Sequence, residues 1–268
     1  MNKENNSQTG NTIIAVSIII LLAVLLLIGL NTHSDNNSKA SVTDDGDLVL
    51  DYSIDVSEEN NESKATSELP DSLKEVLSRG GRSIESIDKE GICQLVTVSS
   101  NGTRATISLF EKEGDTWTEE ESLTTTGFIG KDGAMASISE KTNGTPLGLF
   151  PIGLAFYQGS APATGLDTFR ITKGTYWVDD PNSKYYNQRV QGTKGKDWDS
   201  AEEMWKVEEY KCGFVINYNM PAKYNKGSAI FLHIYYEPTE GCIGLSEDMV
   251  LKYLARLKSS ANPYILIV

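Results

Sequence analysis

Histidine and cysteine are scarce in this chain of 268 residues. It has two histidines and three cysteines, which are His33, His233, Cys93, Cys212 and Cys242. So few cysteines exclude a small disulfide-dense scaffold, and a hydrophobic content of 39% excludes a disordered or collagen-like chain. Each group able to act as a nucleophile, a general base or a soft metal ligand can therefore be weighed individually.

Basic residues are also few, since 24 lysines and arginines face 37 acidic residues and give a formal net charge of -13. Such a charge repels a phosphate backbone and removes the electrostatic attraction on which most nucleic-acid binders depend. The sequence therefore predicts no nucleic-acid partner.

Long hydrophobic runs are limited to one, at residues 12–30, which carries no charge. About 19 residues at 1.5 Å each approach the ~30 Å thickness of the bilayer core. A cleaved secretory signal is the alternative, but its apolar stretch is usually about 7–15 residues and ends at a small-residue site. We therefore expect a single-pass transmembrane helix, preceded by a cytoplasmic tail at residues 1–11, that leaves the rest of the chain extracytoplasmic.

The next segment, residues 31–68, is polar and holds ten acidic and two basic residues. It has too little apolar surface to offset the entropy of ordering it. The sequence predicts an acidic disordered linker here, followed by a short helix and connector at residues 69–91.

Residues 92–268 are predicted to form the folded domain. Turn residues such as Asn101-Gly102 separate short alternating or apolar runs, which predicts antiparallel strands at residues 92–99, 103–112, 116–120, 148–156, 168–172, 212–218 and 229–232. Ser246 is a good N-cap for one apolar-striped helix that ends before Pro263, and a last strand follows. The predicted fold class is mainly β with one packed helix (α+β).

His233 and Cys242 are the candidate catalytic pair. His233 follows an apolar run, and a strand, turn and return across the nine positions to Cys242 would bring imidazole and thiol together. An unperturbed thiol with a pKa near ~8.5 is mostly protonated at neutral pH, so a neighbouring base is needed to activate it. Gly241 would allow close backbone approach, with the amides near Cys242 facing a developing oxyanion.

Three other interpretations of these residues stay open. Cys242 and His233 could be ordinary core residues. The three cysteines and His233 match the ligand count of a structural zinc site, although no C-x₂₋₄-C pair is present. Cys93 and Cys212 could form a disulfide in an exported protein.

Four ordered segments resemble the L,D-transpeptidase family, the YkuD-type catalytic domain of bacterial cell-wall enzymes. His233 and the motif Thr239-Glu240-Gly241-Cys242 are similar to its catalytic segment, residues 141–152 to its Thr-Pro-x-Gly-x-Phe segment, and residues 177–187 to a middle segment. The opening hairpin, with Phe110 and Trp117, also resembles the corresponding part of that family. The likeness covers residues 92–268 and implies an antiparallel β-sandwich or barrel.

The chain departs from the family pattern at two positions. Ile234 stands where the family often has glycine, and Gly244 where it often has arginine. Loss of the arginine removes a fixed donor for a substrate carboxylate or carbonyl, which leaves the stem-peptide chemistry open.

The resemblance implies a cysteine-dependent transpeptidase that acts on peptidoglycan stem peptides without a metal or other cofactor. Cys242 would form a thioester at the carbonyl before a D-residue, and an amine acceptor would then yield a 3→3 cross-link. His233 would act as base and then acid, Gly241 and Cys242 amides would hold the oxyanion, and the Thr239 region would orient the imidazole. Tyr235, Tyr236 and Trp177 are candidate substrate-binding residues.

Two rival functions follow from the same residues. With water as acceptor the enzyme would be an L,D-carboxypeptidase, and without turnover the domain would be a cell-wall-binding module. Under each interpretation the partners are peptidoglycan and, through residues 12–30, the cell membrane.

Overall fold

The computed structural model describes residues 41–42, 48–49 and 68–268. The chain divides into two units, Met1–Ser63 and Lys64–Val268. In the first, strands β1 (Ser41–Val42) and β2 (Leu48–Val49) pair antiparallel. The predicted anchor at residues 12–30 lies outside the described residues. Among the helices that are described, none has the length and apolarity that a membrane crossing requires.

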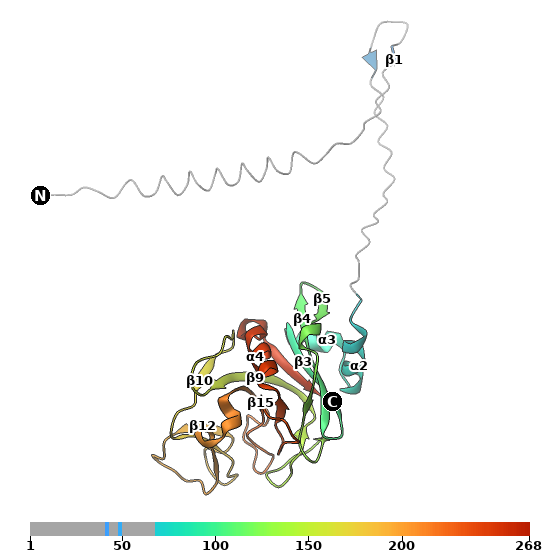
Figure 1. Cartoon of the computed structure of the whole chain (residues 1–268). Helices are drawn as coiled ribbons and strands as arrows, with labels where there is room; N and C mark the ends of the chain where they lie inside the picture. Colours follow the sequence, from blue (N-terminus) through green and yellow to red (C-terminus); the bar gives the residue numbers. More distant parts are fainter. Residues whose placement is uncertain (1–40, 43–47, 50–67) are drawn as a thin grey trace, which may run out of the picture. The chain divides into compact units, whose positions relative to one another are not determined.

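The second unit is built on a closed β-barrel (Figure 1). Eight strands pair in the order β9-β14-β15-β16-β6-β4-β3-β17, and β17 pairs back onto β9. These strands are β3 (Gln94–Asn101), β4 (Arg104–Glu113), β6 (Thr125–Phe128), β9 (Gly148–Tyr157), β14 (Cys212–Ile216), β15 (Phe231–Ile234), β16 (Ile243–Leu245) and β17 (Pro263–Ile267). Two further strands extend the ring, β5 (Thr116–Glu119) beside β4 and β10 (Thr168–Arg170) beside β9.

Strand alternation decides which side chains fill the barrel. Side chains of successive residues point to opposite faces of a strand. In β3, Val96 and Val98 lie in the central core, whereas Leu95 belongs to an outer cluster. In β17, Ile265 lies in the central core and Leu266 in the outer cluster. The predicted mainly-β domain is confirmed, and both faces of its strands are buried at this side.

Helices cover the barrel. The outer cluster is closed by α2 (Asp71–Arg79), whose Leu73 and Leu77 are buried there, while α3 (Ile84–Lys89) follows in the connector. α4 (Glu247–Arg256) directs Val250 and Leu254 into the central core. Ser246 caps α4 as expected, since its side chain accepts a hydrogen bond from the amide of Met249.

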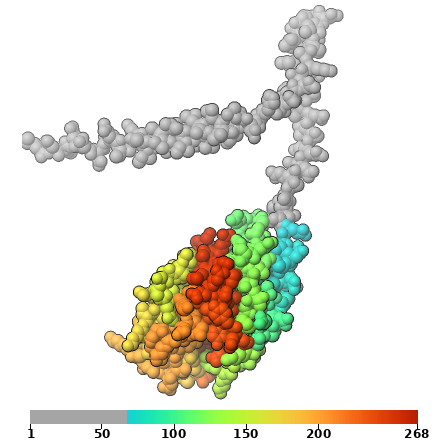
Figure 2. Space-filling model, viewed as in Figure 1, coloured from blue at the N-terminus to red at the C-terminus, as the bar shows by residue number. Residues whose placement is uncertain are grey.

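A smaller three-stranded sheet lies at the side of the barrel away from α2 (Figures 1 and 2). It consists of β12 (Gln188–Gln191), β11 (Thr175–Val178) and β13 (Ala201–Glu203), with β11 in the centre. Trp177 of β11 packs edge-on against Phe231 of β15, with ring centroids 4.9 Å apart. The small sheet thus covers the outer face of β15. The remaining short elements are β7 (Ala134–Met135), β8 (Thr145–Pro146) and the 3₁₀ turns η1 (Glu121–Leu123), η2 (Met204–Lys206), η3 (Glu208–Lys211) and η4 (Ser259–Ala261).

Some local expectations were wrong. The strand expected at residues 229–232 is shifted to β15, because Ala229 has a φ of 54°, a left-handed conformation that cannot continue a strand. His233 is consequently the third of four strand residues and not at the strand end. The motif cysteine is followed by β16, and not directly by the helix. Four strand pairs, β9–β10, β15–β16, β3–β17 and β7–β8, are parallel in the described part of the chain, so the pairing is not antiparallel throughout.

Candidate active site

The turn that carries Cys242 is held by hydrogen bonds from threonine side chains. Thr239 Oγ1 donates to the Cys242 carbonyl at 2.6 Å and accepts from the Gly241 amide at 3.1 Å. Thr145 of β8 donates to the Gly241 carbonyl at 2.8 Å. Gly241 has a φ of 139°, where side chains are strained, and a Cβ at this position would lie 3.2 Å from both the Gly144 carbonyl oxygen and Ile230 Cδ1. The motif glycine is therefore required by backbone conformation and close contact together.

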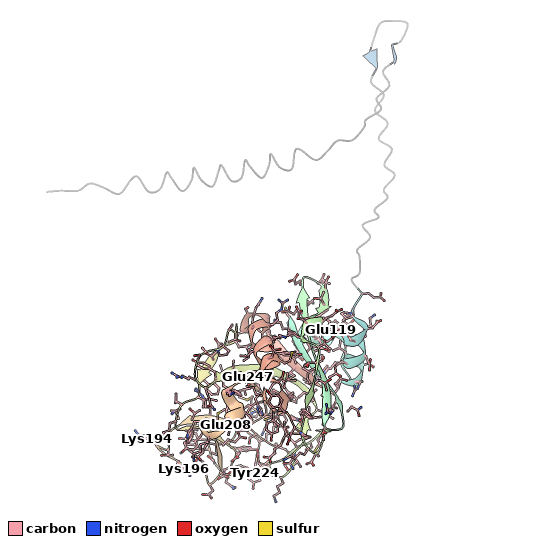
Figure 3. All side chains as sticks on the ribbon, viewed as in Figure 1. Glu119, Lys194, Lys196, Glu208, Tyr224 and Glu247 are labelled. Atoms are coloured by element: carbon pink, nitrogen blue, oxygen red, sulfur yellow. The ribbon has the colours of Figure 1, made fainter. Side chains whose placement is uncertain are left out.

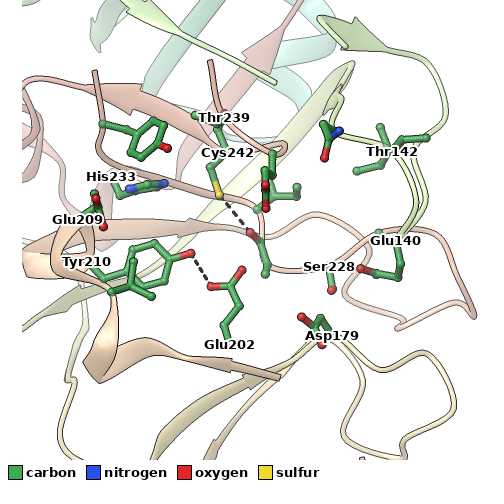
Figure 4. Close-up of a pocket in the computed structure, with 18 of the residues that line it drawn as sticks. Glu140, Thr142, Asp179, Glu202, Glu209, Tyr210, Ser228, His233, Thr239 and Cys242 are labelled. Carbon is green, nitrogen blue, oxygen red and sulfur yellow. Dashed lines mark hydrogen bonds between the residues drawn. The ribbon is translucent and has the colours of Figure 1, made fainter. Parts of the chain in front are cut away.

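The Cys242 thiol is bound by main-chain groups that precede and begin β15. Sγ accepts from the Phe231 amide at 3.3 Å and donates to the Ala229 carbonyl at 3.2 Å (Figure 4). The left-handed conformation of Ala229 turns its carbonyl toward the sulfur. The thiol proton in this structure is therefore directed at Ala229 and not at His233.

His233 reaches the same pocket from β15. Strand alternation puts its side chain on the face that Phe231 uses, while Leu232 and Ile234 enter the barrel core. The imidazole is 6% exposed, and the Tyr210 ring of η3 packs edge-on against it at 4.9 Å. Nδ1 lies 3.0 Å from the Ile234 carbonyl. Because a carbonyl can only accept, Nδ1 carries the proton and Nε2 is left as the basic nitrogen.

Burial sets the protonation states of this pair. It lowers the pKa of His233 to about 4, although the Ile234 carbonyl opposes the shift. Burial, and next the Glu202 carboxylate, raise the pKa of the Cys242 thiol. At neutral pH the resting site therefore holds a thiol and a neutral imidazole, and not a thiolate–imidazolium pair. A neutral imidazole can take the thiol proton as a general base.

Cys242 and His233 line one pocket of about 420 Å³ on the outer face of β15 (Figure 4). Its walls come from the β7–β8 loop, the end of β11, β13, η3 and the segment before β15. Five carboxylates line it, from Glu140, Asp179, Glu202, Glu209 and Glu240. The Tyr210 hydroxyl donates to Glu202. Burial raises the pKa of Glu202 to about 7 against the effect of that hydrogen bond, with Asp179 adding repulsion.

The structure brings together most, but not all, of the residues singled out in the sequence. Thr239, Tyr235, His233 and Cys242 line the pocket. Tyr236 is 62% exposed and belongs to a neighbouring groove with Glu237 and Glu247, whose side chain is labelled in Figure 3.

Trp177 is not in this pocket. It is 6% exposed, and its Nε1 donates to Asn187 at 3.1 Å. It borders a separate pocket of about 440 Å³ that Cys242 does not line. Residues 177–187, the middle segment that resembles the family, therefore support the site from behind, through the packing of Trp177 against Phe231.

Sequence reasoning did not identify Tyr210, Glu202, Asp179, Glu140 or Ser228 as site residues. They come from four segments that no local spacing links to Cys242. The one feature of the sequence that could have indicated them is the polar character of residues 179–228. The sequence alone does not show that these residues lie beside β15.

The structure bears on the two other roles considered for the cysteines, a disulfide and a structural zinc site. Cys93, Cys212 and Cys242 are all free thiols. In residues 68–268 no three His, Cys, Asp or Glu side chains form a group able to hold a metal ion. Burial raises the pKa of Cys212 to about 11, so that thiol is protonated at neutral pH.

The packing around residue 244 explains why this residue is glycine. A Cβ at this position would lie 2.7 Å from the Cβ of Tyr235, which is too close for any side chain. The arginine that the family often has here cannot be accommodated while Tyr235 keeps its place.

The second unit is thus a closed barrel with one pocket that both the Cys242 thiol and the His233 imidazole line. The family model of the L,D-transpeptidase catalytic domain, YkuD, matches residues 95–265. The chain therefore belongs to the L,D-transpeptidase family, which confirms the resemblance seen in its sequence and implies peptidoglycan as its substrate. Compared with curated proteins, the chain has no match.

Proposed function

We propose that this protein is a cysteine-dependent L,D-transpeptidase that acts on peptidoglycan stem peptides. The observation that carries the proposal is that Cys242 and His233 share one pocket, in which burial keeps the imidazole neutral at neutral pH and so able to accept a proton. Membership of the family supplies the substrate class.

The first half-reaction acylates the enzyme. The thiol proton turns from the Ala229 carbonyl to His233 Nε2, and Sγ bonds to the carbonyl carbon before the terminal D-residue. The Gly241 amide is bound to Thr239, so we assign the oxyanion to the amide of Cys242 itself. The C–N bond then breaks, and His233 gives its proton to the departing amine, which leaves a thioester on Cys242.

The second half-reaction reverses these roles. A neutral amine of another stem peptide attacks the thioester carbonyl and loses a proton to His233. The C–S bond breaks, the proton returns to Sγ, and a 3→3 cross-link is released. Water in place of the amine would give a carboxypeptidase.

Incubation of the full-length protein in detergent with disaccharide-tetrapeptides, followed by mass analysis of the products, tests this proposal. A cross-linked dimer supports transpeptidation, while tripeptide alone supports the carboxypeptidase. Cys242→Ser should lower turnover at least about a hundredfold because an alcohol is far harder to deprotonate than a thiol. Unchanged products from the Cys242→Ser variant would refute a cysteine mechanism.

The non-catalytic alternative is tested by alkylation with iodoacetamide. An active Cys242 should react faster than Cys93 and Cys212, at a rate that His233→Gln reduces. Uniformly slow labelling, together with wall binding retained in Cys242→Ala, would favour a binding module.

We also propose that residues 12–30 anchor the protein in the cell membrane with the catalytic domain at the cell wall. The support is the uncharged run of about 19 residues. Fractionation of cells that express the full chain or a variant lacking residues 1–30 tests it. Membrane recovery of both forms would contradict the anchor.

A further inference from the structure

The pocket around Cys242 is strongly acidic without compensating bases. No lysine or arginine is among the residues that line it. Of its five carboxylates, Glu240 pairs with Lys131 at 3.4 Å, and both of these side chains are largely exposed. The other four form no ion pair within the described part of the chain. Lys194 and Lys196 are exposed and extend outward from the domain (Figure 3).

One end of the pocket has polar atoms that are buried and have no partner. Ser228 is 9% exposed, and its Oγ makes no hydrogen bond in the part of the chain that the structure describes. The same is true of Asp179 Oδ1. In Figure 4 the Ser228 side chain points toward Glu140 and Asp179, away from His233. The Tyr186 hydroxyl donates to Glu140 Oε1 and fixes that carboxylate.

Such an arrangement is unfavourable. A buried acceptor without a donor is costly, and like charges close together repel each other. Burial raises the pKa of Glu140, the nearby hydroxyls of Tyr186 and Ser228 oppose that shift, and the charge of Asp179 adds to it. A group that brings positive charge and several N–H donors would relieve both effects at once. A primary ammonium has three donors and one positive charge.

We infer that Glu140, Asp179 and Ser228 form a subsite for a primary ammonium group on the side chain of the peptide whose carbonyl Cys242 attacks. This inference rests on the proposed function. Two carboxylates and one hydroxyl match the three donors of the ammonium. The acceptor amine is a poor occupant, because an amine held by carboxylates keeps its proton and cannot attack the thioester.

The inference can be tested with two tetrapeptide donors that differ in one group. The residue before the terminal D-amino acid is lysine in one donor and Nε-acetyl-lysine in the other. With the full-length protein, the acyl-enzyme on Cys242 should form about tenfold faster with the lysine donor, as expected for loss of one charge-assisted contact. Acylation depends on the donor alone, so this measurement separates the donor's ammonium from the acceptor's amine.

Variants locate the effect within the pocket. In Glu140→Gln/Asp179→Asn the preference for the lysine donor should fall to about twofold or less, and Asp179→Asn alone should lower it partly. Glu203→Gln is the matched control, because Glu203 lies on the same strand as Glu202, pairs with Lys206 and does not line the pocket. Thermal unfolding of each variant establishes that it is folded.

Binding of both donors to Cys242→Ala distinguishes failure of the subsite from failure of the proposed function. Calorimetry should show about tenfold tighter binding of the lysine donor. Equal binding and equal acylation of the two donors, or a preference that survives in the double variant, would overturn the subsite. A binding preference without any acylation would support the subsite and overturn the proposed cysteine chemistry.

Discussion

At the scale of single residues, burial favours the neutral forms of both His233 and Cys242. His233 is fixed by the Ile234 carbonyl and the Tyr210 ring, and Cys242 by the Ala229 carbonyl and the Phe231 amide. Burial makes charging either group costly. Under the proposed function, we expect substrate binding to accompany the proton transfer from sulfur to nitrogen.

The buried imidazole predicts a pH dependence of stability. An unfolded histidine takes a proton near pH 6.5, whereas burial lowers the pKa of folded His233 to about 4. Between these values the unfolded state binds more protons, so the free energy of unfolding falls as the pH drops from about 6.5 to about 4. The total loss from this group is about 3 kcal/mol.

Urea unfolding of the native protein and of His233→Gln at pH 7 and pH 4 measures this contribution. The native protein should lose about 3 kcal/mol more than the variant over that interval. Other titrating groups are common to both proteins and cancel in the comparison. An identical loss in both would show that His233 is already charged at pH 7 or is not buried.

At the scale of elements, the position of the Cys242 thiol depends on a segment that contains neither Cys242 nor His233. Asn187, next to β12, is 4% exposed and has a left-handed φ of 55°. Its Oδ1 accepts from Trp177 Nε1 and from the Ala229 amide, both at 3.1 Å. Its Nδ2 donates to the carbonyls of Tyr218 and Asn219. This side chain links the small sheet to the residue that holds the Cys242 thiol.

Asn187→Ala should destabilise the protein by about 2–4 kcal/mol, because it leaves several buried donors and acceptors without partners. It should also slow alkylation of Cys242, since Ala229 would no longer be held. Urea unfolding and iodoacetamide labelling measure the two effects. Asn225→Ala is the control, because Asn225 also has a left-handed φ, of 52°, but is not part of this network, and it should cost less than about 1 kcal/mol. Equal effects of the two substitutions would mean that conformation alone, and not the network, is responsible.

At the scale of the whole domain, closure of the barrel joins segments that are far apart in the sequence. β17, the last strand, pairs with β3 on one side and with β9 on the other. Ile265 lies opposite Val96 in one pairing and Phe150 in the other, and it is fully buried. The pocket at β15 therefore rests on a ring that only the final strand completes.

Ile265→Ala should lower the free energy of unfolding by about 2–5 kcal/mol, since it leaves a cavity where three strands meet. Leu251→Ala on α4 is the control, because Leu251 is 41% exposed and its truncation should change stability by less than about 1 kcal/mol. Denaturant unfolding of both variants measures the difference. Similar losses would indicate that the closing strand does not bear on the stability of the core.

Local patterns in the sequence predicted most elements of the domain. The strands β3, β4, β5, β9 and β14 and the helix α4 fall close to their expected ranges, because alternation, turn residues and an N-cap act within a few residues. β15 was displaced because nothing in the sequence marks Ala229 as left-handed. β16 was not predicted because its three residues, which follow a glycine-containing turn, are too few to show the alternation that marks a strand.

The sequence by itself determined the family, through an ordered set of motifs around His233 and Cys242, and the mainly-β class. Only the tertiary structure decided which groups surround the sulfur. Tyr210, Glu202, Asp179, Glu140 and Ser228 meet there because a small sheet and three loops fold over the outer face of β15. Burial and charge at one point in space depend on contacts between segments remote in the chain, and no local period or spacing encodes those contacts.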